Sequence, residues 1–282
     1  MGIFDGCLLA SDVDGTLMAS GYLPEINREK IKFFISEGGK FSISTGRSAE
    51  ALGQLFKIFD KDLVSYSIVL NGGMIYDFKE EKVVYDTSVS QRVKEFTKYI
   101  TETDKDMGIE VHLGGKTYVL NRNAESDLHE EYEELKPHYV SYSDIKDLVW
   151  NKSFMAALCE DLRDRLKEKA LEFGLDTREI LETCAEIEGK KRMYLEFLPI
   201  GASKGTALNR LGEIYKVKPG GLFAIGDYYN DASMLSQADV SCATADAPSD
   251  LKETVHFVST SCQEGAVADF IEYLKNNFGG KF

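Results

Sequence analysis

Two pairs of aspartates in this sequence have the types and spacing that chemistry on a charged group would need. Asp12 and Asp14 stand two positions apart in "ASDVDGT", and Asp227 and Asp231 stand four apart in "GDYYND". If the strand before Asp12 continues to Asp14, both side chains point to the same side of it. Like charges held that close are costly unless something offsets them. We therefore expect these acids to gather around a cation.

A hard divalent cation suits these acids best. Mg2+ prefers oxygen ligands, binds one or two protein carboxylates and leaves room for water and a phosphate. Zinc is disfavoured because neither acidic motif contains histidine or cysteine. Two simpler interpretations compete with this cation site. The first is an ordinary turn, because Asp-Gly is a common turn signal. An EF-hand loop fails because Leu17 and Leu23 stand where it needs glycine and glutamate.

The segments around the acids predict an α/β fold, with a Rossmann-like, doubly wound parallel sheet covered by helices on both faces. Short apolar runs alternate with segments of helical spacing at both ends of the chain. The predicted strands span 6–14, 40–45, 66–73, 220–227, 238–243 and 256–260, and the predicted helices span 26–39, 48–59, 203–215 and 230–238.

The pattern changes between residues 87 and 198. Helices are predicted at 90–105, 123–136 and 160–174, a hairpin at 107–121, and strands at 149–159 and 192–199. We expect 87–198 to be an inserted α+β domain, and 1–86 together with 199–282 to form the catalytic core.

More polar residues follow the predicted strand ends or open a helix at the same edge. They are Thr45, Gly46, Arg47, Asn71, Lys204 and Asn230. Ligands of open parallel sheets bind outside the carboxyl ends of the strands. Each residue alone is most simply a turn, a cap or a solvated charge. Their conjunction with two acidic pairs favours a site.

Composition excludes several classes of protein. The chain has 282 residues and a net charge of -14, so it offers no basic face for nucleic acid. No segment is long and apolar enough to cross a bilayer, and the start of the chain lacks the pattern of a signal peptide. Five scattered cysteines without a C-x-x-C pair predict reduced thiols and a cytoplasmic protein.

These motifs resemble the four motifs of the haloacid dehalogenase superfamily. "DVDGT" at 12–16 resembles the first, Thr45 in "STGR" the second, Lys204 in "GASKGTAL" the third and "GDYYND" at 226–231 the fourth. The triplets "TGR", "NGG" and "SKG" narrow the resemblance to the Cof-type sugar-phosphate phosphatases, whose subclass IIB cap is inserted between the second and third motifs. Residues 261–274 resemble the closing helix of the family. Asp246 departs from it, since asparagine is usual there.

The resemblance implies a role for each acid. Asp12 would be the nucleophile that forms an aspartyl-phosphate, and Asp14 the general acid and base. Mg2+ would be held by the Asp12 carboxylate, the Asp14 backbone carbonyl and Asp227. Asp231 would lie behind these ligands and orient water around the metal.

The resemblance also implies which residues bind the substrate. Those at the transferred phosphoryl group would be Gly15, Thr45, Gly46, Lys204 and Asn230, with Thr45 and Lys204 also counted as catalytic. Arg47 and Asn71 would make the first contacts beyond the phosphate. Residues 15–24, "GTLMASGYLP", would form a flap beside the nucleophile.

The implied activity is Mg2+-dependent hydrolysis of a small phosphorylated metabolite, a sugar phosphate above all. A phosphomutase or phosphotransferase using the same intermediate is one alternative, and a catalytically silent phosphometabolite-binding protein is another. The cap residues with suitable chemistry for a sugar or a second anion are His112, Lys116, Arg122 and Lys152. The substrate itself and the oligomeric state stay open at this point.

Overall fold

The computed structural model describes residues 2–278 except 20, 54, 158 and 188, and of residues 185–187 only the backbone. The chain forms two compact units. The first comprises the residues up to Arg47, Leu55–Val84 and those from Ser203 onward, and the second comprises Ser48–Gln54 and Tyr85–Ala202. Among the described helices none combines the length and the apolar character needed to span a membrane.

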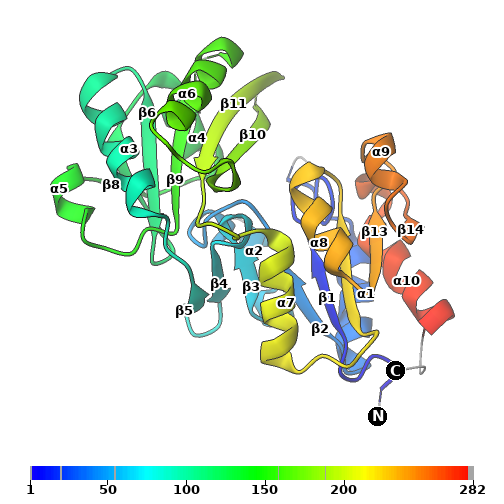
Figure 1. Cartoon of the computed structure of the whole chain (residues 1–282). Coiled ribbons are helices and arrows are strands. Elements are labelled where there is room, and N and C mark those ends of the chain that lie inside the picture. Colours follow the sequence, from blue (N-terminus) through cyan, green and yellow to red (C-terminus); the bar gives the residue numbers. More distant parts are fainter. Residues whose placement is uncertain (1, 20, 54, 158, 188, 279–282) are drawn as a thin grey trace. The chain divides into compact units, whose positions relative to one another are not determined.

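A five-stranded parallel sheet forms the centre of the first unit, in the order β14-β13-β12-β1-β2 (Figure 1). Its strands are β1 (Leu8–Ser11), β2 (Lys40–Ile43), β12 (Leu222–Gly226), β13 (Val240–Ala243) and β14 (Phe257–Val258). Every neighbouring pair is parallel, which confirms the predicted α/β fold.

The third predicted strand has a different partner from the one a simple parallel sheet would supply. β3 (Ser67–Val69) pairs antiparallel with β4 (Met74–Asp77), which neighbours β5 (Lys82–Asp86). A parallel bridge from Ser44 to Ile68 connects this small sheet with the end of β2, and the Thr45 N–H donates to the Ile68 carbonyl at 2.9 Å. That bridge is enough to bring the end of β3 beside the end of β2.

Four helices cover the two faces of the parallel sheet (Figure 1). α1 (Glu25–Ser36) packs against α10 (Ala266–Phe278), and α7 (Lys204–Tyr215) packs against α8 (Ala232–Gln237). The connection from β1 to β2 and that from β12 to β13 run in opposite directions along the sheet. Because such crossovers are right-handed, their helices α1 and α8 must lie on opposite faces.

The helix predicted for residues 48–59 is wrong as a single element. The structure has a 3₁₀ turn, η1 (Ala51–Gly53), and one turn of helix, α2 (Leu55–Ile58). The Ser48 hydroxyl accepts the Ala51 N–H at 3.2 Å, and Gly53 weakens the helix that its neighbours would favour. η1 belongs to the second unit, and the short helices of the first unit besides α2 are η2 (Lys61–Leu63), η3 (Leu70–Gly72), η5 (Tyr229–Asp231), α9 (Ser249–Lys252) and η6 (Cys262–Glu264).

The second unit is a six-stranded sheet in the order β10-β11-β9-β6-β7-β8. The strands are β6 (Gly108–Leu113), β7 (Lys116–Asn121), β8 (His138–Tyr139), β9 (Lys152–Ala157), β10 (Ile180–Ile187) and β11 (Lys190–Phe197). The helices are α3 (Gln91–Thr103), α4 (Ala124–Tyr132), α5 (Tyr142–Ile145), α6 (Glu160–Glu172) and the 3₁₀ turn η4 (Thr177–Glu179). β10 was not predicted, because its sequence "ILETCAEI" lacks a clear alternation of apolar and polar residues. It lies at the edge of the sheet.

Alternation along the strands gives this second sheet two different faces. Ile109, Val111 and Met155 belong to the apolar core formed with α3 and α6. The residues between them point the other way, and Phe154 stacks there on His129 of α4 with ring centroids 4.4 Å apart.

One close backbone contact sets where α7 begins and yields a test. Gly72 has φ +96°, and a Cβ there would lie 2.1 Å from the Ser203 carbonyl oxygen, at the N-cap of α7. We expect Gly72→Ala to lower the free energy of unfolding by about 2–3 kcal/mol through overpacking and backbone strain. Chemical denaturation measures this change.

Gly53→Ala is the matched control for that substitution. A Cβ at Gly53 meets no heavy atom within 4 Å. We expect its effect to stay within about 0.5 kcal/mol. Equal losses in the two variants would contradict the close-contact explanation.

Candidate active site

The two acidic motifs follow the neighbouring strands β1 and β12, at the point where the order of strands in the sheet reverses. β1 and β12 are neighbours, and the chain leaves them toward opposite edges of the sheet. This is the topological switch point at which open α/β sheets bind their ligands. Asp12 follows β1 directly, and its N–H donates to the Ile225 carbonyl at 3.0 Å. Asp227 follows β12 in the same way.

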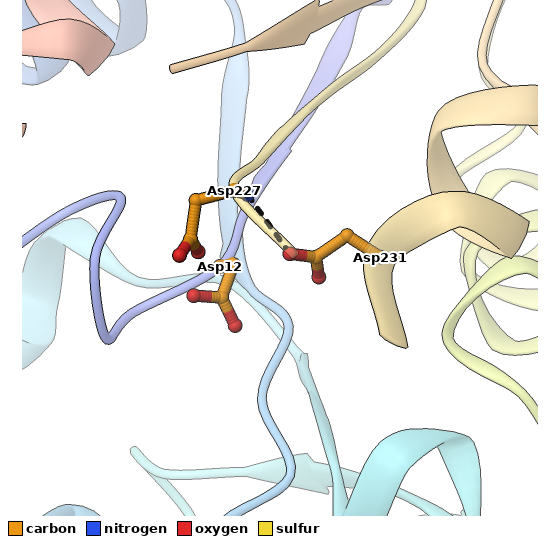
Figure 2. Close-up of side chains that lie close together, drawn as sticks. All are labelled: Asp12, Asp227 and Asp231. Carbon is orange, nitrogen blue, oxygen red and sulfur yellow. Dashed lines mark hydrogen bonds between the residues drawn. The ribbon is translucent and has the colours of Figure 1, made fainter. Parts of the chain in front are cut away.

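Three carboxylates converge at this point (Figure 2). Asp12, Asp227 and Asp231 each offer an oxygen, and these oxygens lie within 4.8 Å of one another. Asp12 is 6% exposed and Asp231 is fully buried. Removing like charges from water at such short range is unfavourable unless cations accompany them.

Lys204 supplies one of the compensating charges. It is the first residue of α7, whose N-cap Ser203 accepts the Thr206 N–H with its hydroxyl at 3.1 Å. The Lys204 Nζ donates to Asp12 Oδ1 and to Asp231 Oδ1, both at 2.6 Å. Burial alone would lower the pKa of Lys204, but the two carboxylates outweigh it and raise that pKa. Lys204 therefore carries a fixed positive charge.

Asp231 holds the loop that carries the fourth motif. Its Oδ2 accepts the N–H of Asp227 at 3.0 Å, drawn in Figure 2, and that of Tyr228 at 3.3 Å. Its other oxygen is the one that binds Lys204. A carboxylate with these partners fixes its neighbours more readily than it binds a ligand, because most of its acceptor positions are occupied.

One ammonium group does not balance three carboxylates, so the site has an excess of negative charge. That excess contributes to the raised pKa values of Asp12 and Asp227. Burial is the main cause that raises the pKa of Asp12 well above its ordinary value, against the lowering effect of Lys204. Burial and then the charge of Asp231 raise the pKa of Asp227 to about 6. A divalent cation would remove this excess. The donors are all oxygen atoms, so the site fits Mg2+ chemistry.

Asp14 lies outside this buried group and has a partner of its own. The Arg47 guanidinium donates to both of its oxygens, at 2.7 and 2.8 Å. Directly after Asp14 the chain turns at Gly15, which has φ +89°. A Cβ on Gly15 would lie 2.4 Å from an Asp227 oxygen, so only glycine lets these segments approach.

The other predicted polar residues gather around the ends of β2 and β3. The Thr45 hydroxyl accepts the Arg47 N–H at 3.1 Å, and the Asn71 N–H donates to the Thr45 carbonyl at 3.0 Å. The Asn71 backbone is left-handed, with φ 52°, and its Oδ1 accepts from Asn230 Nδ2 at 3.4 Å. A Cβ on Gly46 would lie 3.0 Å from Asn71 Nδ2.

The predicted site residues thus form two groups around the switch point. Asp12, Gly15, Lys204, Asp227 and Asp231 surround the buried charges. The others follow β2 and β3 or join them, and they are Asp14, Thr45, Gly46, Arg47, Asn71 and Asn230.

Thr16 is a residue of the site that was not predicted from the motifs. Thr16 is fully buried, and its hydroxyl donates to Asp227 Oδ1 at 2.9 Å. Its place directly after Gly15 in the predicted flap was the available signal. Of that flap, 15–24, Ser20 lies outside the described residues. Asp246, the departure from the family pattern, accepts the Cys262 N–H at 3.0 Å.

The four polar residues expected to serve a sugar or second anion lie in different environments within the second unit. His112 and Lys152 are buried, and Lys152 lies 3.2 Å from Glu196. Burial, followed by the charge of Lys152, lowers the pKa of His112 well below its ordinary value. Arg122 is exposed and pairs with Asp127 at 2.8 Å, while Lys116 is exposed. The structure does not gather them into one anion site.

The raised pKa of Asp227 predicts how the metal-free protein responds to pH. The folded state keeps this proton up to pH about 6, whereas the unfolded chain loses it near about pH 4. Raising the pH through that window should therefore lower the melting temperature of the metal-free wild type relative to Asp227→Asn. Thermal unfolding in chelator from pH 4.5 to 7.5 measures the difference.

Mg2+ should act in the opposite sense. It must displace the Asp227 proton at low pH, so the stabilisation it provides should grow as the pH rises through about 6. If the melting temperatures of the wild type and Asp227→Asn changed with pH in the same way, the raised pKa of Asp227 would be contradicted.

The comparisons with known proteins agree with this geometry. Residues 9–271 match the family model of the haloacid dehalogenase-like hydrolases. A phosphatase from Bacillus subtilis, the 5-amino-6-(5-phospho-D-ribitylamino)uracil phosphatase YwtE, is 27% identical over 94% of this chain and 97% of its own. The putative phosphatase YxeH of the same organism is 25% identical over 95% of this chain and 97% of its own.

Solved structures share the fold at lower identity. A protein from Thermotoga maritima superposes with a TM-score of 0.77 at 21% identity, over 95% of this chain and 97% of the other. A sugar phosphatase of haloacid dehalogenase subclass IIB superposes with a TM-score of 0.78 at 18% identity, over 95% and 98% of the two chains. The fold is that of the subclass IIB phosphatase, and because the family model covers nearly the whole chain, this protein belongs to the haloacid dehalogenase-like hydrolases.

Proposed function

We propose that this protein is a Mg2+-dependent phosphatase that hydrolyses small phosphorylated metabolites through an aspartyl-phosphate on Asp12. One observation carries the proposal above all others. The Asp12 carboxylate lies at the switch point of the sheet, held by Lys204 at 2.6 Å and grouped with Asp227 and Asp231. A structural sheet gains nothing from that concentration of charge, whereas phosphoryl transfer requires it.

In the first half-reaction a carboxylate oxygen of Asp12 forms a bond to phosphorus. The bond from phosphorus to the substrate oxygen breaks, and Asp14, as the acid, gives that oxygen its proton. Lys204 binds one oxygen of the Asp12 carboxylate, and so fixes the direction in which the other oxygen faces. When bound, Mg2+ would supply charge stabilisation to the phosphoryl oxygens, with Asp12 and Asp227 as its carboxylate ligands and the Asp14 carbonyl as a third.

In the second half-reaction water attacks the phosphorus of the aspartyl-phosphate. Asp14, now ionised, takes a proton from that water, the bond from Asp12 to phosphorus breaks, and inorganic phosphate leaves. Asp14 is suited to both tasks because it is more exposed than the buried acids. Its bidentate pair with Arg47 must loosen when Asp14 is protonated, since a neutral carboxylic acid accepts less well from a guanidinium group.

The remaining polar residues of the site are assigned to the substrate. Thr45, Lys204, Asn230 and the backbone N–H groups that follow Asp12 would donate to the transferred phosphoryl group. Arg47 and Asn71 would contact the part of the substrate next to it. Asp231 serves by orienting Lys204 and the backbone of Asp227.

A sugar or sugar-alcohol phosphate is the substrate class we propose. Two relatives support it by what their own names say: one dephosphorylates a phosphoribitylamino uracil, and the other is a sugar phosphatase. Specificity within this class depends on residues that fold alone does not determine.

Phosphate release from a broad panel of phosphorylated metabolites tests the activity. We expect Mg2+-dependent release by the wild type and a loss of at least about a thousandfold in Asp12→Asn, which removes the nucleophile. Asp5→Asn is the control. It makes the same substitution before the amino end of β1, whereas Asp12 follows the carboxyl end, and it should keep full activity. A substrate that yields an isomer without phosphate would identify a mutase, and tight binding without turnover would identify a binding protein.

Asp14→Asn separates the two half-reactions. Without an acid and a base, turnover should fall about 10²–10⁴-fold. If loss of the base limits hydrolysis more than loss of the acid limits phosphorylation, the phosphoenzyme should accumulate. Mass spectrometry of acid-quenched protein detects one added phosphoryl group on Asp12. Wild-type turnover at every pH in this variant would remove Asp14 from the acid–base role.

A further inference from the structure

Asn27 is a fully buried polar residue with no part in the mechanism above, and it lies in α1. Its side-chain amide bonds in two directions. Oδ1 accepts the N–H of Ala268 at 2.9 Å, and Nδ2 donates to the carbonyl of Leu17 at 3.0 Å. A buried amide with both ends bonded to backbone specifies the positions of both segments, because either bond is costly to lose.

The Ala268 bond is at the start of α10. Ala268 is the third residue of that helix, so its N–H has no acceptor within the helix. The chain enters the helix through Gly265, where φ is +99° and a Cβ would lie 2.4 Å from Ile26. Farther along the same pair of helices, Lys30 pairs with Glu272 at 2.7 Å. Asn27 thus satisfies the open end of α10 while Lys30 binds its side.

The Leu17 bond is at the turn that follows the first acidic motif. In that turn the N–H groups of Leu17 and Met18 both donate to the Val13 carbonyl, at 3.1 and 2.9 Å. The residue between Gly15 and Leu17 is Thr16, whose hydroxyl donates to Asp227 Oδ1 at 2.9 Å. A displacement of the Leu17 carbonyl therefore moves the group that holds Asp227.

We propose that Asn27 is a positioning residue that couples the docking of α10 to the turn aligning Asp227, and through it to the affinity of the site for Mg2+. The proposal rests on the proposed function for its Mg2+ part. The coupling runs from Ala268 through Asn27 to Leu17, and from the adjoining Thr16 to Asp227. A role limited to capping α10 would need only the first of these bonds.

Two substitutions separate the coupling from the cap. Asn27→Asp keeps an oxygen for the Ala268 N–H, in a position where a negative charge suits the helix N-terminus, but it loses the donor to Leu17. Asn27→Leu has a similar size and loses both bonds. Lys30→Met is the matched control, because it breaks the Lys30–Glu272 pair between the same helices and leaves the turn intact.

Hydrogen–deuterium exchange reports on the turn without any reference to activity. We expect faster exchange at the amides of residues 15–18 in Asn27→Asp and Asn27→Leu, and unchanged exchange there in Lys30→Met. Calorimetric titration with Mg2+ alone should show about three- to tenfold weaker binding in both Asn27 variants, less than the roughly 10- to 100-fold lost when a direct partner of a metal ligand is removed, because Asn27 acts one step farther away. Binding by Lys30→Met should match the wild type.

Unchanged exchange at residues 15–18 in Asn27→Asp would overturn the coupling. Faster exchange with wild-type Mg2+ affinity would overturn its link to the metal site. If the wild type itself bound no Mg2+, the proposed function would fail along with that link, while the exchange measurement would still decide whether Asn27 holds the turn.

Discussion

The balance of charge around one buried ammonium group governs this structure. Lys204 lies between Asp12 and Asp231 at 2.6 Å from each, and Asp227 adds a third carboxylate for which the described residues show no salt bridge. These residues by themselves carry more negative than positive charge. Together with burial, that excess raises the pKa values of Asp12 and Asp227. In the proposed function, a cation would bind among the carboxylates, and the cation and Lys204 would then share the anionic substrate.

Contacts between residues far apart in the sequence keep these charges at short range. Asp12 and Lys204 are 192 positions apart in the chain, and Thr16 and Asp227 are 211 apart. Glycine makes the approach feasible at Gly15, beside Asp227, and at Gly72, beside the N-cap of α7. The parallel register of β1 and β12 then sets both strand ends at one level. The charges are therefore held in part by each other, through the Lys204–Asp12 ion pair, and in part by neutral groups, namely the Thr16 hydroxyl, the two glycines and the paired strands.

Much of this could be predicted from the sequence, because short apolar runs, glycines and strand-terminal acids are local signals. Asp12, Asp227, Asp231 and Lys204 were expected at one edge of the sheet, and they lie together there. Three features could not be predicted. The edge strand β10 depends on its partner strand rather than on periodicity, and the break in the helix at 48–59 depends on the local hydrogen bond of Ser48 and on Gly53, which the apolar spacing does not reveal. The pairing of Lys152 with Glu196 within the second unit depends on side-chain direction across strands.

The parallel pairing of β1 with β12 also affects how the chain must be made. Leu8 pairs with Leu222, so one edge of the first strand waits for about 210 further residues before its neighbour exists. At a synthesis rate of about 5–20 residues per second, that wait lasts about 10–40 seconds. For that time a buried, apolar strand exposes unpaired N–H and C=O groups, which is a template for aggregation. The order of strands that brings Asp12 beside Asp227 thus also creates an interval in which one edge of β1 has no partner strand.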